Sequence, residues 1–453
     1  MRTRIALLAS LAGLAVSSAA QAQPQTFFFY TGTDFGNWNS ALNWTPFGIP
    51  SVAGHVPLIP GGKTVRFGTG APGAITIDKM QIDHGGQVEI LNDYDMTIRT
   101  QTDGVGTLGL LSLSGILFMS AVNNSTDLIL SGPGGSYLTV GGMPGCPNLI
   151  SMSNSVNNRI YGASGLERLD LQTGSTIAGA GQVGVNILQI NNAGVISAVG
   201  GAGLTIDPSA AGLVNSGFLI ADTGNLTLFF GPYTNTLGII RSMSASVLLT
   251  GCDITGGVFE STGAGRIQLN TTGASTIVRG ITNNGIIRLP NDADCYLLGG
   301  MTNNGTIEML ANNNSTDLYF GDNFTYSGSG TIALSNSVNN RMFDVTSANQ
   351  GRTLTNAGNT ITGSGQIGLN TINIVNQAAG SILATGANGL VIDPATTFVN
   401  EGTLRAENTS FLNFITGTYT FAAPAVAGTG GIVFFSGGTY TGTIDSEGTG
   451  VCR

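Results

Sequence analysis

The chain repeats itself, and this repetition constrains the fold more than any other feature of the sequence. The heptapeptide SNSVNNR occurs at Ser153–Arg159 and again, unchanged, at Ser335–Arg341. Three other segments also return at similar offsets, Asn123–Leu128 at Asn313–Leu318, Gly179–Gly184 at Gly363–Gly368, and Leu204–Pro208 at Leu390–Pro394. A block of about a hundred residues has therefore been duplicated, roughly 121–230 and 311–416, with small insertions and deletions between its landmarks.

A shorter period runs inside each block. Glycines that precede a short apolar segment recur every 20 to 23 residues, at Gly174, Gly194 and Gly217, at Gly285 and Gly305, and at Gly358, Gly380 and Gly402. A fixed period of this length is typical of a solenoid. The segments are rich in Ile, Val, Leu, Thr and Phe and are punctuated by Asn and Gly, which predicts short strands. We therefore predict an all-β, right-handed parallel β-helix with coils of about 20–23 residues, because parallel crossovers favour that hand.

The Asn-Gly pairs have an expected place at the corners of this helix. We expect Asn284-Gly285 and Asn304-Gly305 to lie above one another in adjacent coils, with backbone φ angles that are positive and therefore favour Asn and Gly. Asparagine side chains at stacked corners can form amide ladders. At a strand spacing of about 4.8 Å, the coils would build a rod on the order of 85 Å long.

The N-terminus has the pattern of a secretory signal peptide. Arg2 and Arg4 precede the apolar run Ile5–Val16, and Ala20-Gln21-Ala22 resembles a cleavage site. We expect residues 1–22 to be this signal, 23–70 to form an N-terminal cap, and 71–453 to form the β-helix. Trp38 and Trp44 fall in the cap, where large aromatic side chains would close the open end of a solenoid. The alternative is that the two rings form a platform on which sugars stack.

The composition excludes several classes of partner. Only 9% of residues are charged and the net charge is −9, so the chain lacks the basic surface that binds nucleic acid or anionic lipid. No run after the signal is long and apolar enough for a transmembrane helix. With 42% hydrophobic residues, the chain should fold into an ordered structure.

The repeats resemble those of a known protein group. The N-x-G-T-I coils, the corner TITGSGQIG and the segment FGNWNSALNWTPFGIPSVAGHVPLIPGG are similar to those of secreted bacterial β-helix proteins, the group of autotransporter passengers and large exoproteins. The resemblance covers about two thirds of the mature chain and does not include the C-terminal barrel of autotransporters. It implies a surface-exposed rod with an adhesive or structural role.

Motifs for cofactors and metals fit less well. GAGQVG and GSGQIG match the dinucleotide fingerprint, but strand-like sequence follows each of them, where that fingerprint needs a helix. Calcium at Asp207, at Asp93 with Asp95, or at Asp292 with Asp294 would need further oxygen ligands that the sequence does not provide nearby. His55 and His84 are the only histidines, and we interpret them as isolated loop residues. We therefore assign no cofactor and no metal site.

Polysaccharide cleavage is the enzymatic alternative, since hydrolysis needs two carboxyl groups roughly 5 to 10 Å apart. Asp207 with Asp222, and Asp393 with Glu407, have recurring spacings, although solvated carboxylates explain them equally well. We assign no catalytic residue. The four cysteines, Cys146, Cys252, Cys295 and Cys452, allow three pairings between which the sequence does not decide, and we expect Cys452 to be unpaired within the chain.

The sequence thus predicts an exported surface or extracellular-matrix rod with an adhesive or structural role. The alternative is a carbohydrate-active or carbohydrate-binding β-helix protein that acts on extracellular polysaccharide. The expected partners are glycans or other surface and matrix proteins, and the rods could also associate side by side or end to end.

Overall fold

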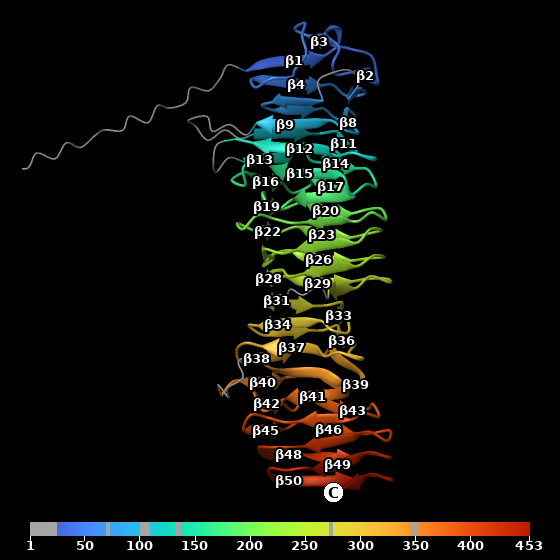
Figure 1. The fold of residues 1–453 in the computed structure, drawn as a ribbon, viewed down its shortest axis with the longest axis vertical. Coiled ribbons are helices and arrows are strands. Elements are labelled where there is room, and N and C mark those ends of the chain that lie inside the picture. The colour runs from blue at the N-terminus through green and yellow to red at the C-terminus, as the bar shows by residue number, and fades with distance from the viewer. Residues whose placement is uncertain (1–24, 69–72, 100–108, 133–136, 271–274, 346–350) are drawn as a thin grey trace, which may run out of the picture.

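A computed structural model shows a β-solenoid of stacked parallel coils and about 16 turns, with 56% of residues in strands and 1% in helix (Figure 1). It describes residues 25–68, 73–99, 109–132, 137–270, 275–345 and 351–453. At about 4.8 Å per turn, this stack is roughly 77 Å long. The prediction of a parallel β-helix is confirmed.

Each coil contributes strands to three faces, and every face is a continuous parallel ladder. Face A consists of β1 (Thr26–Tyr30), β4 (His55–Ile59), β7 (Met80–Ile82), β10 (Gly109–Leu113), β13 (Tyr137–Gly141), β16 (Arg168–Leu171), β19 (Gln189–Asn192), β22 (Leu213–Asn215), β25 (Pro232–Thr234), β28 (Asp253–Thr255), β31 (Thr276–Arg279), β34 (Asp294–Leu298), β37 (Thr316–Phe320), the second halves of β39 (Thr331–Asp344) and β41 (Thr360–Gly368), then β44 (Leu390–Ile392), β47 (Phe411–Phe414), β49 (Ile432–Phe435) and β51 (Val451–Cys452).

Face B follows face A along the chain. It consists of β2 (Gly36–Asn37), β5 (Thr64–Phe67), β8 (Gln87–Leu91), β11 (Ile116–Ser120), β14 (Leu149–Met152), β17 (Thr176–Gly179), β20 (Val195–Ala198), β23 (Phe218–Ala221), β26 (Ile239–Ser242), β29 (Val258–Ser261), β32 (Thr282–Asn283), β35 (Met301–Asn303), β38 (Phe324–Ser327), β40 (Thr353–Asn356), β42 (Asn373–Asn376), β45 (Thr397–Asn400), and the first halves of β48 (Thr418–Ala427) and β50 (Thr439–Ser446).

Face C completes each coil. It consists of β6 (Ala74–Ile77), β9 (Asp95–Arg99), β12 (Thr126–Ser131), β15 (Asn158–Gly162), β18 (Gly181–Gly184), β21 (Leu204–Ile206), β24 (Leu226–Phe229), β27 (Val247–Thr250), β30 (Ile267–Leu269), β33 (Ile286–Leu289), β36 (Thr306–Met309), the first halves of β39 and β41, then β43 (Ser381–Ala384), β46 (Thr403–Ala406), and the second halves of β48 and β50.

Coil length is not uniform along the rod. Between Arg159 and Arg288, successive partners on face C lie 20 to 23 residues apart, as predicted. Nearer the N-terminus the coils are longer, since Asp95 pairs with Asp127 and Asp127 pairs with Arg159, 32 residues apart in each case. The parallel pairing also begins at β1 and β4, so coils already occupy part of the segment that we expected to be cap.

The two sequence copies lie on different faces. In the first copy, β15 and β18, which contain the second half of SNSVNNR and the GQVG segment, belong to face C. In the second copy, the equivalent parts of β39 and β41 pair with each other on face A. Likewise, β21 of LTIDP is on face C, whereas β44 of LVIDP is on face A. The duplicated block has therefore been turned by one face about the rod axis.

Asparagine ladders follow the same turn. Asn192 donates its side-chain amide to Asn215, and Asn215 donates to Asn235, at 2.7 Å each, where the chain leaves face A. In the later coils the ladder lies where the chain leaves face B. Its bonds there run from Asn283 to Asn303, Asn303 to Asn359, Asn356 to Asn376, and Asn376 to Asn400, at 2.7 to 2.9 Å. These amides are buried, so the ladders supply the hydrogen bonds that buried polar groups require.

The glycines of the Asn-Gly corners are needed for a reason other than the predicted one. Asn304 does bond Asn284 at 3.0 Å, and Gly305 does lie over Gly285. However, neither glycine has a positive φ. A Cβ on Gly305 would instead lie 2.0 Å from the carbonyl oxygen of Gly285, because adjacent coils approach closely here. The expected left-handed backbone was wrong, and close stacking explains the repeated glycine.

Inside the solenoid, alternate strand residues pack in one continuous core from Phe28 to Val433. Trp38 and Trp44 belong to this core, with exposed fractions of 0% and 2%. The Trp38 indole donates to the carbonyl oxygen of Pro50 at 3.0 Å, and the Trp44 indole donates to that of Trp38 at 2.8 Å. The rings close the N-terminal end, so the alternative of a sugar-stacking platform on these tryptophans is wrong.

Candidate functional site

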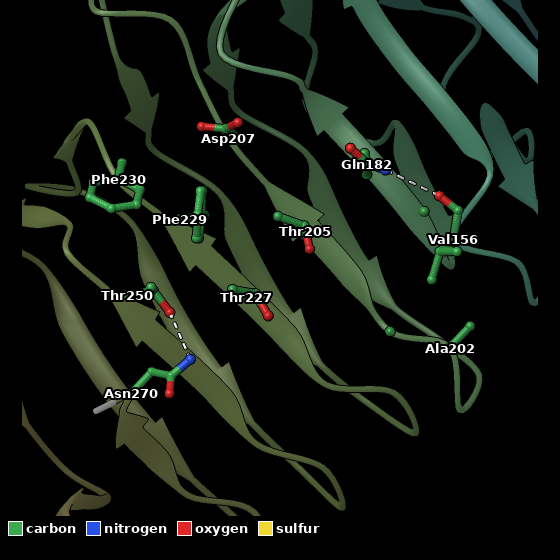
Figure 2. Close-up of a pocket in the computed structure, with 12 residues that line it drawn as sticks. Val156, Gln182, Ala202, Thr205, Asp207, Thr227, Phe229, Phe230, Thr250 and Asn270 are labelled. Atoms are coloured by element: carbon green, nitrogen blue, oxygen red, sulfur yellow. Dashed lines mark hydrogen bonds between the residues drawn. The ribbon is translucent and has the colours of Figure 1, made fainter. Parts of the chain in front are cut away.

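A groove of about 630 Å³ lies on face C in the first sequence copy. Its walls and floor come from consecutive coils, mainly from β18, β21 and β24 (Figure 2). The lining residues are Val156, Gly181, Gln182, Ala202, Gly203, Thr205, Asp207, Thr227, Phe229, Phe230, Thr250 and Asn270. A groove of this size on a rod with flat parallel faces is a candidate binding site.

The floor of the groove is a row of uncharged polar side chains. Gln182 pairs with Thr205, and Thr205 pairs with Thr227, in the parallel register of face C. Their neighbours Val183, Ile206 and Leu228 point inward and are fully buried. Because side chains alternate along a strand, the three polar groups point outward into the groove. The row therefore presents one hydroxyl or amide per coil.

Two aromatic rings border one side of this row (Figure 2). The Phe229 and Phe230 rings are 4.6 Å apart between centroids and nearly perpendicular. Phe230 is 45% exposed and has a φ of 42°, which is rare for a bulky residue. Its amide donates to the carbonyl oxygen of Thr250 at 2.9 Å, and this bond anchors the turn.

Asp207 supplies the only carboxyl group among the residues that line the groove. Its backbone is held in the coil, since its amide donates to the carbonyl oxygen of Val183 at 2.9 Å and its own carbonyl accepts from Asn186 at 2.8 Å. Its side chain has no hydrogen-bond partner in the described part of the chain. Partial burial raises the pKa of this carboxyl above its ordinary value.

The structure does not bring the predicted carboxyl pairs together across a groove. Asp207 follows β21 on face C, whereas Asp222 follows β23 on face B. Asp393 follows β44 on face A, and Glu407 follows β46 on face C, where it bonds Arg405 at 2.8 Å. Asp207 is thus the one member of these pairs that lines the groove.

The histidines also lie apart from the groove. His55 is in β4 on face A, where its Nδ1 accepts from the Ser51 amide at 3.1 Å and its ring is 4.6 Å from that of Phe28. Burial lowers the pKa of His55. His84 follows β7 in an adjacent coil, and neither residue lines the groove.

The G-x-G-x-x-G segments are coil turns. The first spans the end of β17 and all of β18, and the next element is strand β19, not a helix. The second lies inside β41 and is followed by β42. A Cβ on Gly181 would lie 2.3 Å from the carbonyl oxygen of Asn158, so close contact between coils explains these glycines.

The aspartates considered for calcium take part in a different arrangement. Asp95, Asp127 and Arg159 are in register on face C, and Asp294, Asp317 and Arg341 repeat that column on face A. No group of three or more His, Cys, Asp or Glu side chains suited to a metal ion occurs within the described ranges. The aspartates instead surround an arginine from the following coil.

Sequence reasoning missed this ion pair. Arg159 bonds both oxygens of Asp127, and the Tyr161 hydroxyl donates to Asp127 at 3.0 Å. Arg341 likewise bonds both oxygens of Asp317, to which the Tyr319 hydroxyl donates at 2.8 Å. The signal was present in the repeats, because the Asp of NNSTDL and the Arg of SNSVNNR occur together in both copies.

The four cysteines are all free thiols. Cys252 and Cys295 are buried, Cys146 is partly buried, and Cys452 is exposed. Along the described ranges, no helix has the length and apolar character that crossing a membrane requires. In comparisons with known proteins, no protein-family model, curated protein or solved structure matches the chain.

Proposed function

We propose that the protein is exported and serves as a surface or extracellular-matrix rod with an adhesive or structural role. The observation that carries this proposal is the uninterrupted stack of about 16 coils with three long outer faces. Such a stack spans a distance and offers the same kind of surface many times along its length.

The distribution of charge supports the proposal. Most arginines on the faces bond an acidic side chain in an adjacent coil, as Arg66 does with Glu89, Arg241 with Glu260 and Arg288 with Glu308. These charges hold neighbouring coils together. The outward surface between them consists largely of Thr, Ser, Asn and Gln, which suits contacts with uncharged hydroxylated surfaces.

Export is the part of the proposal that rests on sequence alone. The segment with signal-peptide character, residues 1–22, lies outside the described residues. Its test compares the full chain with a variant in which Leu11 and Leu14 of the apolar run are replaced by Asp. We expect the full chain to be released or displayed at the cell surface and the variant to be retained in the cytoplasm. Cytoplasmic retention of the unchanged chain would contradict export.

Adhesion is tested separately with purified mature protein on surfaces coated with extracellular polysaccharide or matrix protein. A distributed rod should bind through many weak contacts, so removal of single side chains on faces A and B should reduce retention only modestly. Failure to bind any such surface would leave a structural role as the supported version.

The carbohydrate alternative is favoured by one observation, the groove on face C. Glycoside hydrolysis by the usual route needs two carboxyl groups on either side of the bond that is cleaved, and the described lining contains only Asp207. The groove therefore supports binding over cleavage. Incubation of the protein with neutral polysaccharides and an assay for new reducing ends distinguishes the two, since a binder should release none.

A further inference from the structure

We propose that the groove bordered by Phe229, Phe230 and Asp207 binds a neutral oligosaccharide that lies along the rod axis. This inference rests on the proposed extracellular role and names a ligand class for it. Sugar rings would pack their C–H faces against the two phenyl rings. Hydroxyl groups would bond Asp207 and the row Gln182, Thr205 and Thr227.

The second sequence copy provides an internal comparison. In both copies a glycine with positive φ, Gly231 or Gly417, precedes a buried tyrosine by two residues. The hydroxyl groups of these tyrosines, Tyr233 and Tyr419, donate to the carbonyl oxygens of Ile206 and Ile392 at 2.8 and 3.0 Å. The backbone frame is thus shared by the two copies.

Within this shared frame the side chains differ. Alignment on the glycine places Phe229 and Phe230 of the first copy opposite Ile415 and Thr416 of the second. Only the first copy has aromatic rings at this corner. The second copy therefore contains the same turn without the surface on which a sugar ring could pack.

The two aspartates differ in the same way. In the second copy, the Thr416 hydroxyl donates to Asp393 at 2.5 Å, so that carboxylate already has a partner. In the first copy the position of Thr416 is taken by Phe230, which has no donor. Asp207 is consequently left without a side-chain partner among the described residues, while it lines the groove. A partly buried carboxylate in this state is a ready acceptor for ligand hydroxyl groups.

The conformation of Phe230 also points to a ligand. A bulky residue with positive φ costs on the order of 1–3 kcal/mol and occurs most often where a site requires it. Thr416, at the equivalent position, has no positive φ. The strained backbone and the exposed ring therefore occur together, and only in the copy that has the groove.

The spacing of the polar row favours an extended glycan. Gln182, Thr205 and Thr227 belong to successive coils, whose separation of about 4.8 Å is close to the length of one sugar unit in an extended chain. The described lining contains no Lys or Arg. An acidic glycan would meet the Asp207 carboxylate with no compensating cation, so a neutral glycan fits better.

The test uses the mature chain on an array of linear neutral oligosaccharides, with uronic-acid and amino-sugar oligosaccharides for comparison. We expect binding to at least one neutral series and weaker binding to the acidic series. Preferred binding of amino sugars would overturn the proposal in favour of a cation site, and binding to no neutral oligosaccharide would overturn it outright.

Variants then place the site. Changing Phe229→Ile with Phe230→Thr installs the residues of the second copy, and Asp207→Asn removes the charge. Each should weaken binding by about tenfold or more, the equivalent of roughly 1.4 kcal/mol. The matched control Asp393→Asn should change binding less than about twofold, which is below 0.5 kcal/mol. Equal binding by wild type and the double variant would contradict the proposal.

Two readouts separate this inference from the proposed function. Limited proteolysis of each variant shows whether the coils remain intact, because coil opening would expose new cleavage sites. Cell-surface location reports on the rod itself. A protein that reaches the surface but binds no neutral glycan refutes the groove proposal alone, whereas a protein that remains in the cytoplasm contradicts the exported rod.

Discussion

The Arg159 guanidinium bonds both carboxylate oxygens of Asp127, which lies in register with it in the preceding coil. The Asp127 side chain is only 3% exposed, whereas that of Arg159 is 35% exposed. The pair therefore holds two long coils together at one position of face C. Its duplicate, Arg341 with Asp317, does the same on face A.

Replacement of Asp127 by Asn should loosen the coils locally. The change removes the charge but keeps the size, and it leaves buried polar groups imperfectly bonded, at a cost of about 1–3 kcal/mol. Because solenoid stability is approximately a sum over coils and their interfaces, the loss should be confined to neighbouring strands. Hydrogen exchange should quicken in β12 and β15 and stay unchanged beyond β24. The control Glu308→Gln breaks a more exposed pair and should cost less than about 1 kcal/mol.

A methyl group at Gly217 should be poorly tolerated. A Cβ there would lie 2.1 Å from the carbonyl oxygen of Gly194 in the preceding coil, so Gly217→Ala should cost about 1–3 kcal/mol through overpacking. At Gly201 a Cβ would meet nothing within 4 Å, and φ is not positive, so Gly201→Ala should be neutral or slightly stabilising. Urea denaturation of both variants measures the contrast, and equal stability would refute the close-stacking explanation.

The cysteines should react with a thiol reagent in a definite order. Cys452 is exposed and should be labelled first in the native protein, followed by the partly buried Cys146. Cys252 and Cys295 should react only after unfolding, because burial raises the pKa of both thiols, that of Cys252 to about 12. Rapid native labelling of either buried cysteine, or a disulfide between Cys452 and another cysteine of the same chain, would contradict this order.

Alkaline pH should weaken the Asp127 cluster through Tyr161. Burial first, then the Asp127 charge and the hydrogen bond to it, raise the pKa of Tyr161 to about 12, whereas an unfolded tyrosine ionises near pH 10. The contribution to stability is therefore complete below about pH 10 and is lost as the pH rises through about 12, since the unfolded state releases its proton first. Urea midpoints over this range should fall less steeply for Tyr161→Phe than for the wild type. Identical slopes would remove Tyr161 from the account.

The fold was predictable because its sequence signal is periodic. Glycine and asparagine recur at each coil, and apolar residues alternate between them, so the pattern predicted stacked parallel strands. The reason for each glycine was less accessible. Gly285 and Gly305 looked like positive-φ residues, but only the observed stacking shows that the carbonyl oxygen of one lies against the Cα of the other.

The placement of the two copies could not be read from the repeat. Which face a strand joins depends on the summed lengths of all intervening turns, and small insertions shift it without changing any motif. The groove was missed for a related reason. Phe229 and Phe230 looked like ordinary strand residues, and only comparison with Ile415 and Thr416 marks them as a difference between the copies.

The stacked register itself can be measured directly by electron paramagnetic resonance between two spin labels. Gln182 and Ala333 are connected through seven successive pairings on face C, by way of Thr205, Thr227, Leu248, Gln268, Arg288 and Glu308. With labels at Gln182→Cys and Ala333→Cys in a chain whose native cysteines are replaced by serine, seven coil spacings predict a narrow distribution centred near about 34 Å. A broad distribution, or a centre beyond about 45 Å, would be incompatible with seven stacked coils and would contradict the parallel solenoid on which the proposed rod and its groove depend.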